Sequence, residues 1–131
     1  MKPIGTHIIL DMYNIDLNKL ANINSSEESE YFWDNFINSC FKEANITCLK
    51  KSWHNFDNNG AFTGIYLLAE SHLSIHTWPE YNFIAVDIFT CGNSNTQLIA
   101  DKLITYFESK NKNIQIIKRG ENMCNCDETK I

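Results

Sequence analysis

Three segments with strand-like sequence follow one another in the middle of the chain, and only short breaks separate them. Residues 61–69 are strongly apolar, and residues 71–78 and 83–90 continue with β-branched and aromatic side chains. The last two segments are joined by Pro79-Glu80-Tyr81-Asn82, whose composition is typical of a turn. Because so short a connection joins antiparallel strands, this part of the chain predicts a β-hairpin within an antiparallel sheet.

The flanking sequence predicts three more strands and two helices. The strands are expected at residues 5–13, 45–53 and 114–118. Helices are expected over about 27–44, where apolar residues recur at helical spacing, and over about 95–109. Each has a capping-box pair near its start, Ser25 with Glu28 and Ser94 with Gln97. The chain is therefore expected to form one α/β domain, residues 1–131, in which an antiparallel sheet carries two helices on one face, a two-layer α+β fold.

Composition limits the classes of protein to which the chain can belong. Its 131 residues, 44% of them hydrophobic, suffice for one domain with a core, and the net charge of −5 argues against a nucleic-acid surface. The chain contains no apolar run of about 18 residues that would span a membrane, and residues 1–7 lack a signal-peptide core. The five cysteines are odd in number and irregularly spaced, which argues against a disulfide framework. A cytoplasmic location without nucleic-acid or membrane partners is expected.

The predicted hairpin brings a cysteine to a serine that lies twenty residues before it. If residue 78 faces residue 83, paired positions have numbers that sum to about 161. Ser71 then lies opposite Thr90, with Cys91 as its diagonal neighbour. Directly opposed residues are about 5 Å apart and diagonal ones about 7–8 Å, so the register predicts a thiol close to Ser71.

His76 is expected to lie far from Ser71 on the same strand. Five residues of strand span about 16 Å, and an odd offset places two side chains on opposite faces. The even positions from His72 to His76 therefore share one face, and the odd positions from Ser71 to Ile75 share the other. If Ser71 and His76 act in one reaction, His76 must come from a second copy, which predicts an active site shared across a homodimer.

Each of these residues also has an ordinary structural interpretation. His72 and His76 are compatible with core or surface positions or with a two-ligand metal pair, but zinc needs three or four ligands and no third has an evident spacing. No metal site is therefore predicted. A lone cysteine such as Cys91 is most often a small buried residue, and Phe56 and Trp78 are equally compatible with a core. Residue types and spacing alone leave these alternatives open.

Two motifs together resemble one enzyme family. Residues 70–80, Glu-Ser-His-Leu-Ser-Ile-His-Thr-Trp-Pro-Glu, and residues 87–92, Asp-Ile-Phe-Thr-Cys-Gly, closely resemble the short bacterial and archaeal form of S-adenosylmethionine decarboxylase. The resemblance is dense over residues 70–92 and looser over residues 4–20 and 54–64. Members of this family are pyruvoyl enzymes of polyamine synthesis, including spermidine synthesis.

The resemblance implies that the chain is a proenzyme that cleaves itself between Glu70 and Ser71. The Ser71 hydroxyl would attack the Glu70 carbonyl to form an ester, and elimination and hydrolysis would convert Ser71 into a pyruvoyl cofactor, without a metal. The products would be a β chain, residues 1–70, and an α chain, residues 71–131. His76 matches the family residue that assists this processing by proton transfer.

The resemblance also implies the roles of residues during turnover. The pyruvoyl group would form a Schiff base with S-adenosylmethionine and accept electrons as CO₂ leaves, giving decarboxylated S-adenosylmethionine, an aminopropyl donor. Cys91 matches the proton donor, Phe56 and Trp78 match the residues that sandwich adenine, and Glu80 matches the carboxylate for the ribose hydroxyls. In this family the sites lie at the interface of a homodimer, which after cleavage is a heterotetramer of two α and two β chains.

The segment before the cleavage strand departs from the family pattern. Residues 54–64, His-Asn-Phe-Asp-Asn-Asn-Gly-Ala-Phe-Thr-Gly, lack the usual proline and contain one extra residue. Thr63 stands where the family has a serine that assists processing. Threonine retains the hydroxyl, so assistance by Thr63 is expected, although its methyl group could slow cleavage.

Two other functions fit parts of the same pattern. One is a pyruvoyl decarboxylase of the same fold that acts on arginine or ornithine, but Trp78 and Glu80 favour a nucleoside substrate because a small amino acid needs no adenine clamp. The other is a non-catalytic homologue that regulates an active partner. The presence of Ser71, His76 and Cys91 argues against that alternative.

Overall fold

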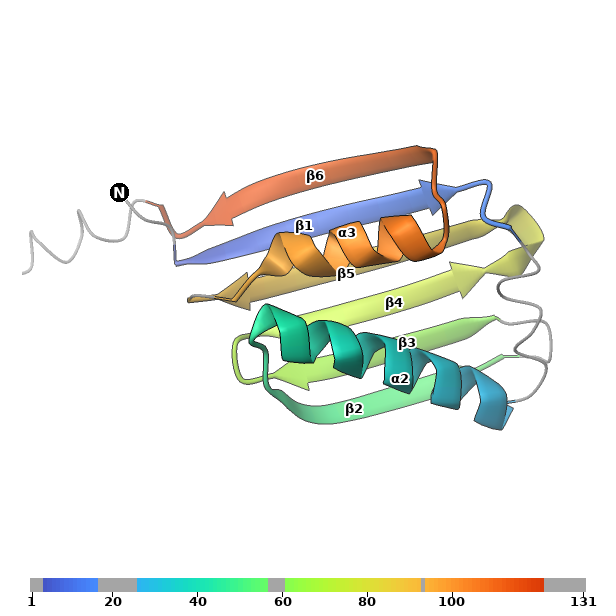
Figure 1. Cartoon of the computed structure of the whole chain (residues 1–131), viewed down its shortest axis with the longest axis horizontal. Coiled ribbons are helices and arrows are strands. Elements are labelled where there is room, and N and C mark those ends of the chain that lie inside the picture. Colours follow the sequence, from blue (N-terminus) through green and yellow to red (C-terminus); the bar gives the residue numbers. More distant parts are fainter. Residues whose placement is uncertain (1–3, 17–25, 57–60, 93, 122–131) are drawn as a thin grey trace, which may run out of the picture.

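The computed structural model describes residues 4–16, 26–56, 61–92 and 94–121 (Figure 1). In chain order its elements are β1 (Gly5–Tyr13), α2 (Ser26–Ala44), β2 (Cys48–Asn55), β3 (Phe62–Leu68), β4 (His72–Trp78), the short 3₁₀ helix η1 (Pro79–Tyr81), β5 (Phe83–Cys91), α3 (Thr96–Tyr106) and β6 (Asn111–Arg119). The order of strands and helices is the predicted one, and η1 occupies the predicted turn. No helix in these ranges is long and apolar enough to cross a membrane.

The six strands form one antiparallel sheet in the order β2-β3-β4-β5-β1-β6. Strands β2 to β5 follow one another as successive antiparallel neighbours, whereas β1 pairs with both β5 and β6. Figure 1 shows α2 and α3 lying across the same face of this sheet. The predicted two-layer α+β fold is therefore confirmed.

The hydrophobic core fills the space between the helices and the sheet. Alternate residues of the central strands point toward the helices and are buried. Its largest members include Ile8, Leu10, Met12, Trp33, Ile37, Phe62, Tyr66, Leu73, Ile75 and Phe107. Trp33 of α2 stacks on Phe62 of β3, with ring centroids 5.7 Å apart. Burial of each such side chain contributes about 1.5–3 kcal/mol, so this layer fixes which face of every strand is left for the site.

The predicted register of the β4–β5 hairpin is confirmed. His72 pairs with Phe89 and Trp78 pairs with Phe83, so that the numbers of paired residues sum to 161. The predicted alternation of faces is also confirmed within β4, where Leu73 and Ile75 are buried under the helices. The even-numbered residues of β4 point to the opposite face.

That opposite face is not covered by any described helix, and we call it the open face. Its side chains come from alternate positions of β1, β3, β4 and β5. They include His7, Thr63, Ile65, Leu67, His72, Ser74, His76, Trp78, Phe83, Asp87, Phe89 and Cys91. Ile65 and Leu67 are about half exposed, at 51% and 49%. Polar and apolar side chains are thus mixed on a surface that the fold leaves uncovered.

The strand predicted at 45–53 begins later in the structure, at Cys48. Asn45 has φ 60°, the left-handed conformation that commonly ends a helix. The backbone N–H of Ile46 then donates to the carbonyl of Phe41 at 2.9 Å. Asn45 and Ile46 therefore end α2 and do not begin β2.

The predicted N-terminal cap of the last helix is wrong by one residue. The side chain of Asn95, not that of Ser94, accepts a hydrogen bond from the backbone N–H of Leu98 at 3.1 Å. The Ser94 hydroxyl instead donates to the carbonyl of Asn45 at 3.4 Å. Ser25, from the other predicted capping box, lies outside the described residues.

Candidate active site

The bond predicted to be cleaved lies in a two-residue turn between β3 and β4. Leu68 and Ser71 exchange backbone hydrogen bonds, N–H of Leu68 to O of Ser71 at 3.0 Å and N–H of Ser71 to O of Leu68 at 3.2 Å. Ala69 and Glu70 form the tip between them. The Glu70–Ser71 peptide is therefore held at a tight bend by its own backbone neighbours.

The tip of this turn is attached to the connection between α2 and β2. The backbone N–H of Ala69 donates to the carbonyl of Thr47 at 2.9 Å. The Glu70 carboxylate in turn accepts from the backbone N–H of Thr47 at 3.1 Å. Both residues before Ser71 are thus anchored to a segment that stays with residues 1–70, which fixes the carbonyl side of the predicted cleavage site.

Cys91 lies at the same end of the sheet as Ser71. Strand pairing between β4 and β5 begins at His72, and continuing this register by one step places Ser71 opposite Thr90, next to Cys91. Cys91 also pairs with Gly5 of β1 and is half-buried on the open face. No hydrogen bond joins the Ser71 and Cys91 side chains in the described part of the chain, so the structure brings them to one end of the sheet without direct contact.

The other described cysteines do not lie on a strand adjacent to β4. Cys40 is a buried residue of α2, and burial raises the pKa of its thiol to about 11, so this thiol is protonated at neutral pH. Burial also raises the pKa of the Cys48 thiol, on β2. Cys124 and Cys126 lie outside the described residues. Cys48 pairs with Leu68 at the same end of the sheet but lies on β2, two strands away from β4. Cys91 is therefore the described cysteine on a strand adjacent to β4 at the Ser71 end.

Five residues singled out in the sequence line one pocket at the opposite end of β4. The pocket has a volume of about 450 Å³ and is lined by Phe56, Ala61, Thr63, His76, Thr77, Trp78 and Glu80. The lining comes from the end of β2, from β3 and β4, and from η1. The structure therefore brings together the predicted adenine, ribose and processing residues.

Within this pocket Thr63 and His76 form a hydrogen-bonded pair. They are directly opposed in the β3–β4 register, and Thr63 Oγ1 lies 3.1 Å from His76 Nδ1. If Nδ1 carries the proton and donates to the threonine hydroxyl, Nε2 of the neutral imidazole has a free lone pair that can accept a proton. The bond to Thr63 thus holds Nδ1 in place and leaves Nε2 of His76 available for proton transfer.

Aromatic rings form one wall of the pocket. Phe83 stacks on Trp78 with ring centroids 5.4 Å apart, and the His76 ring lies 5.8 Å from that of Trp78. Phe56 is 63% exposed and Trp78 is 37% exposed. Exposed aromatic faces beside the carboxylate of Glu80 suit a flat ligand that carries positive charge and hydroxyl groups.

Ser71 and His76 are not brought together within one chain. Ser71 precedes the first residue of β4, whereas His76 lies near the other end on the open face beside Thr63. The extended strand between them spans about 16 Å, at about 3.3 Å per residue. The structure therefore contains two groups of predicted residues, Ser71 with Cys91 and the pocket around His76.

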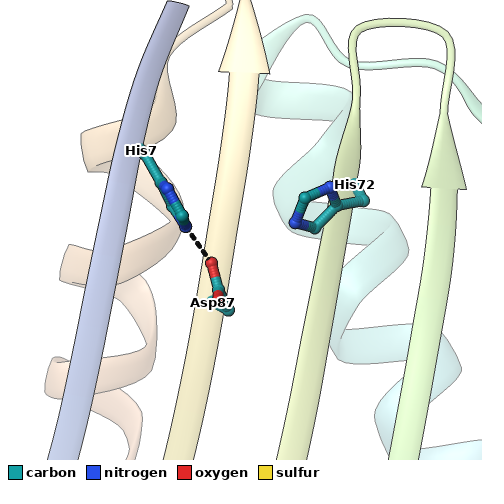
Figure 2. A group of neighbouring side chains, drawn as sticks. All are labelled: His7, His72 and Asp87. Carbon is teal, nitrogen blue, oxygen red and sulfur yellow. Dashed lines mark hydrogen bonds and ion pairs between the residues drawn. The ribbon is translucent and has the colours of Figure 1, made fainter. Parts of the chain in front are cut away.

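One cluster of side chains on the same face was not predicted from the sequence. His7, His72 and Asp87 place their ligand atoms within 4.8 Å of one another (Figure 2). A signal was present in the strand pattern, because all three are at alternate positions that point away from the helices. Sequence alone did not show that β1 lies beside β5, and so it did not place His7 next to the other two.

Comparison with known proteins gives the family of the chain. The sequence profile of the S-adenosylmethionine decarboxylase family matches residues 6–120. The S-adenosylmethionine decarboxylase proenzyme of Aquifex aeolicus (strain VF5) is 37% identical over 120 residues, covering 91% of this chain and 83% of that protein. The proenzyme of Picrophilus torridus is 37% identical over 118 residues, covering 89% and 85%.

A solved structure shares both the fold and the sequence pattern. The crystal structure of the adenosylmethionine decarboxylase from Aquifex aeolicus VF5 superposes with a TM-score of 0.76 at 35% identity. The match covers 92% of this chain and 93% of that one. The chain therefore belongs to the S-adenosylmethionine decarboxylase family.

Proposed function

We propose that this chain is a self-processing, pyruvoyl-dependent S-adenosylmethionine decarboxylase. The observation that carries the proposal is the single pocket in which Phe56, Thr63, His76, Trp78 and Glu80 converge. Family membership supports the reaction, and the relatives' designation as proenzymes supports maturation by cleavage. The product would be decarboxylated S-adenosylmethionine, with CO₂ released.

Maturation would start at the turn between Glu70 and Ser71. The Ser71 hydroxyl attacks the Glu70 carbonyl, and the amide becomes an ester as the peptide nitrogen is released as an amine. Removal of the Ser71 Cα proton then breaks the ester, leaving the Glu70 carboxylate and a dehydroalanine that hydrolyses to pyruvoyl and ammonia. A hydrogen-bonded Thr63–His76 pair is suited to the proton transfers, because a neutral imidazole both accepts and returns a proton near pH 7.

Ser71 fits the position of a pyruvoyl group because it lies between an anchored turn and the first residue of β4. Once Ser71 is converted, the group supplies an electron-accepting carbonyl for decarboxylation. The anchoring of Ala69 and Glu70 to Thr47 would keep the new carboxyl end of residues 1–70 in place after cleavage. Cys91, at the same end of the sheet, would return a proton to the substrate carbon that loses CO₂.

Substrate binding is assigned to the pocket around Trp78. Phe56 and Trp78 would hold the adenine between their faces, and Glu80 would accept hydrogen bonds from the ribose hydroxyls. The positive sulfonium is favoured near aromatic faces and a carboxylate, since both provide negative potential. Ornithine and arginine have no adenine base that could stack between these two rings.

The active unit is proposed to be a homodimer, which becomes two α and two β chains after cleavage. Ser71 and His76 are about 16 Å apart along β4, too far for proton transfer within one chain. Cys91 and the pocket both lie on the open face, so a second copy that packs against this face can bring its pocket to the end of the sheet where Cys91 and the Ser71 turn lie. Each site would then combine residues of both copies, related by a two-fold axis.

The reaction is tested by the release of labelled CO₂ from carboxyl-labelled S-adenosylmethionine, arginine and ornithine. We expect release from S-adenosylmethionine alone, and only from protein that has been cleaved. Release from arginine or ornithine but not from S-adenosylmethionine would overturn the substrate assignment. Absence of both cleavage and CO₂ release would instead favour a regulatory homologue.

Replacing Cys91 by alanine should separate maturation from turnover. The Cys91→Ala chain is expected to cleave, because attack on Glu70 does not need the thiol, but its kcat for decarboxylation should fall by about 10²- to 10⁴-fold, the usual contribution of a positioned acid. Mass spectrometry measures cleavage and labelled CO₂ measures turnover. Cys48→Ala is a matched control, since Cys48 lies at the same end of the sheet but on β2, two strands away from β4. Full activity in Cys91→Ala would remove the proton-donor assignment.

A further inference from the structure

Three side chains that the proposed reaction does not use meet at the centre of the open face. His7 comes from β1, Asp87 from β5 and His72 from β4, and Figure 2 shows them side by side on adjacent strands. The register explains the meeting: His7 and His72 both pair with Phe89, and Asp87 lies two residues away from Phe89 on the same face of β5. Three adjacent strands of one sheet thus hold the cluster.

We propose that His7, His72 and Asp87 form a binding site for a divalent transition-metal ion of the zinc class. Their ligand atoms lie within 4.8 Å of one another, close enough to converge on one ion after small side-chain rotations. Two imidazoles and one carboxylate form a ligand set that zinc and cobalt commonly occupy, with a position left open for water. From the sequence, His72 was considered only with His76, and no third ligand was evident. The sheet instead places His7 of β1 and Asp87 of β5 beside His72, and His76 is not part of this cluster.

His72 is the clearest sign that the cluster is more than a hydrogen-bonded pair. His7 Nε2 is bonded to the Asp87 carboxylate, whereas the ring nitrogens of His72 have no hydrogen-bond partner among the described residues. Its ring packs edge-on against those of His7 and Phe89, with centroids 6.3 and 5.9 Å away. Figure 2 shows the ring on the side of β4 that faces the pair. A neutral imidazole in this position offers a free lone pair beside a carboxylate.

Arg119 of β6 would compete with the ion. Its guanidinium lies 3.2 Å from His7 Nδ1 and 5.1 Å above the Phe89 ring. A guanidinium can only donate, so His7 Nδ1 accepts and Nε2 carries the proton that is donated to Asp87. An ion bound at Nε2 requires that proton to move to Nδ1, where Arg119 then has no acceptor. Metal binding should therefore displace Arg119, and loss of Arg119 should strengthen metal binding.

The site can be tested by titrating the EDTA-stripped protein with Zn²⁺ by calorimetry and with Co²⁺ by visible absorption. The titration uses a Cys124→Ser/Cys126→Ser background, which removes two thiols that would themselves bind zinc. We expect one ion per chain and a cobalt spectrum of a site with nitrogen and oxygen ligands. Because neither readout depends on cleavage or CO₂ release, the result is independent of the proposed function.

Three substitutions and one control decide the outcome. Asp87→Asn and His72→Gln, which preserve side-chain size, should each raise the Kd by about 10-fold or more, because each removes one of three ligands. Arg119→Gln should lower the Kd, a gain that damage to the fold would not produce. His54→Ala, which removes a histidine on β2 outside the cluster, should leave the Kd unchanged. A Kd that is the same in all four variants, or no saturable binding at any Zn²⁺ concentration up to millimolar, would overturn the proposal.

Discussion

Replacing Ser71 by alanine is expected to leave the chain in one piece. Alanine has no hydroxyl to attack the Glu70 carbonyl, so the ester that leads to cleavage cannot form. The turn itself should survive, because Ser71 is held there through its backbone N–H and C=O. Mass spectrometry of the purified variant should give a single chain of about 15.2 kDa, whereas the parent gives residues 1–70 and a fragment from residue 71 with a blocked N-terminus.

The control for this prediction is Ser74→Ala on the same strand. Ser74 lies on the open face of β4, three residues beyond Ser71, and has no assigned role in cleavage. This variant should be cleaved as fully as the parent. Cleavage between Glu70 and Ser71 in the Ser71→Ala chain would mean that another nucleophile opens the peptide bond, and the proposed maturation would then be wrong.

Local sequence was sufficient to predict the fold around β4. The length of the 79–82 turn sets the pairing of residue 78 with residue 83, and a hairpin register propagates along both strands once one pair is fixed. Period-two alternation then separates Leu73, under the helices, from His76, on the open face. Register and alternation together predict that the side chains of Ser71 and His76 point to opposite faces of the sheet.

Non-local pairing was the part that sequence could not supply. β1 lies between β5 and β6, although more than sixty residues separate β1 from either strand. No periodicity within residues 5–13 distinguishes this position from an edge, so the meeting of His7 with Asp87 was not predictable. The anchoring of Glu70 to Thr47 is similar, since it joins a hairpin tip to a helix end that precedes it by 23 residues.

The residues of the pocket were predicted from the resemblance to the decarboxylase family and not from their spacing in the sequence. Phe56, directly after β2, and Glu80, in η1, have no spacing that links them to Thr63 or His76. The β2–β3 and β3–β4 pairings make these segments neighbours, and the pocket forms where they end together. The hydroxyl of Thr63 lies 3.1 Å from His76 Nδ1, so threonine retains a hydrogen-bonding group at the position where the family is expected to have serine.

Co-expression of Ser71→Ala and His76→Ala chains should restore cleavage that neither variant shows alone. In a two-fold dimer with shared sites, a mixed dimer has one site that lacks both residues and one site that has both. The intact site pairs Ser71 of the His76→Ala chain with His76 of the Ser71→Ala chain. If equal amounts pair at random, half of the dimers are mixed, and about a quarter of all chains should be cleaved.

The identity of the cleaved chain makes this result decisive. Only the His76→Ala chain should be cut, since the Ser71→Ala chain has no nucleophile, and the mass difference between the two substitutions identifies the fragments. Co-expression of Ser71→Ala with Cys91→Ala serves as a positive control, because the Cys91→Ala chain should cleave by itself. If mixed dimers form, as tagged pull-down would verify, but no His76→Ala chain is cut, then His76 does not act across the interface. Ser71 and His76 would in that case need to approach within one chain, and β4 would have to bend where the sheet now holds it straight.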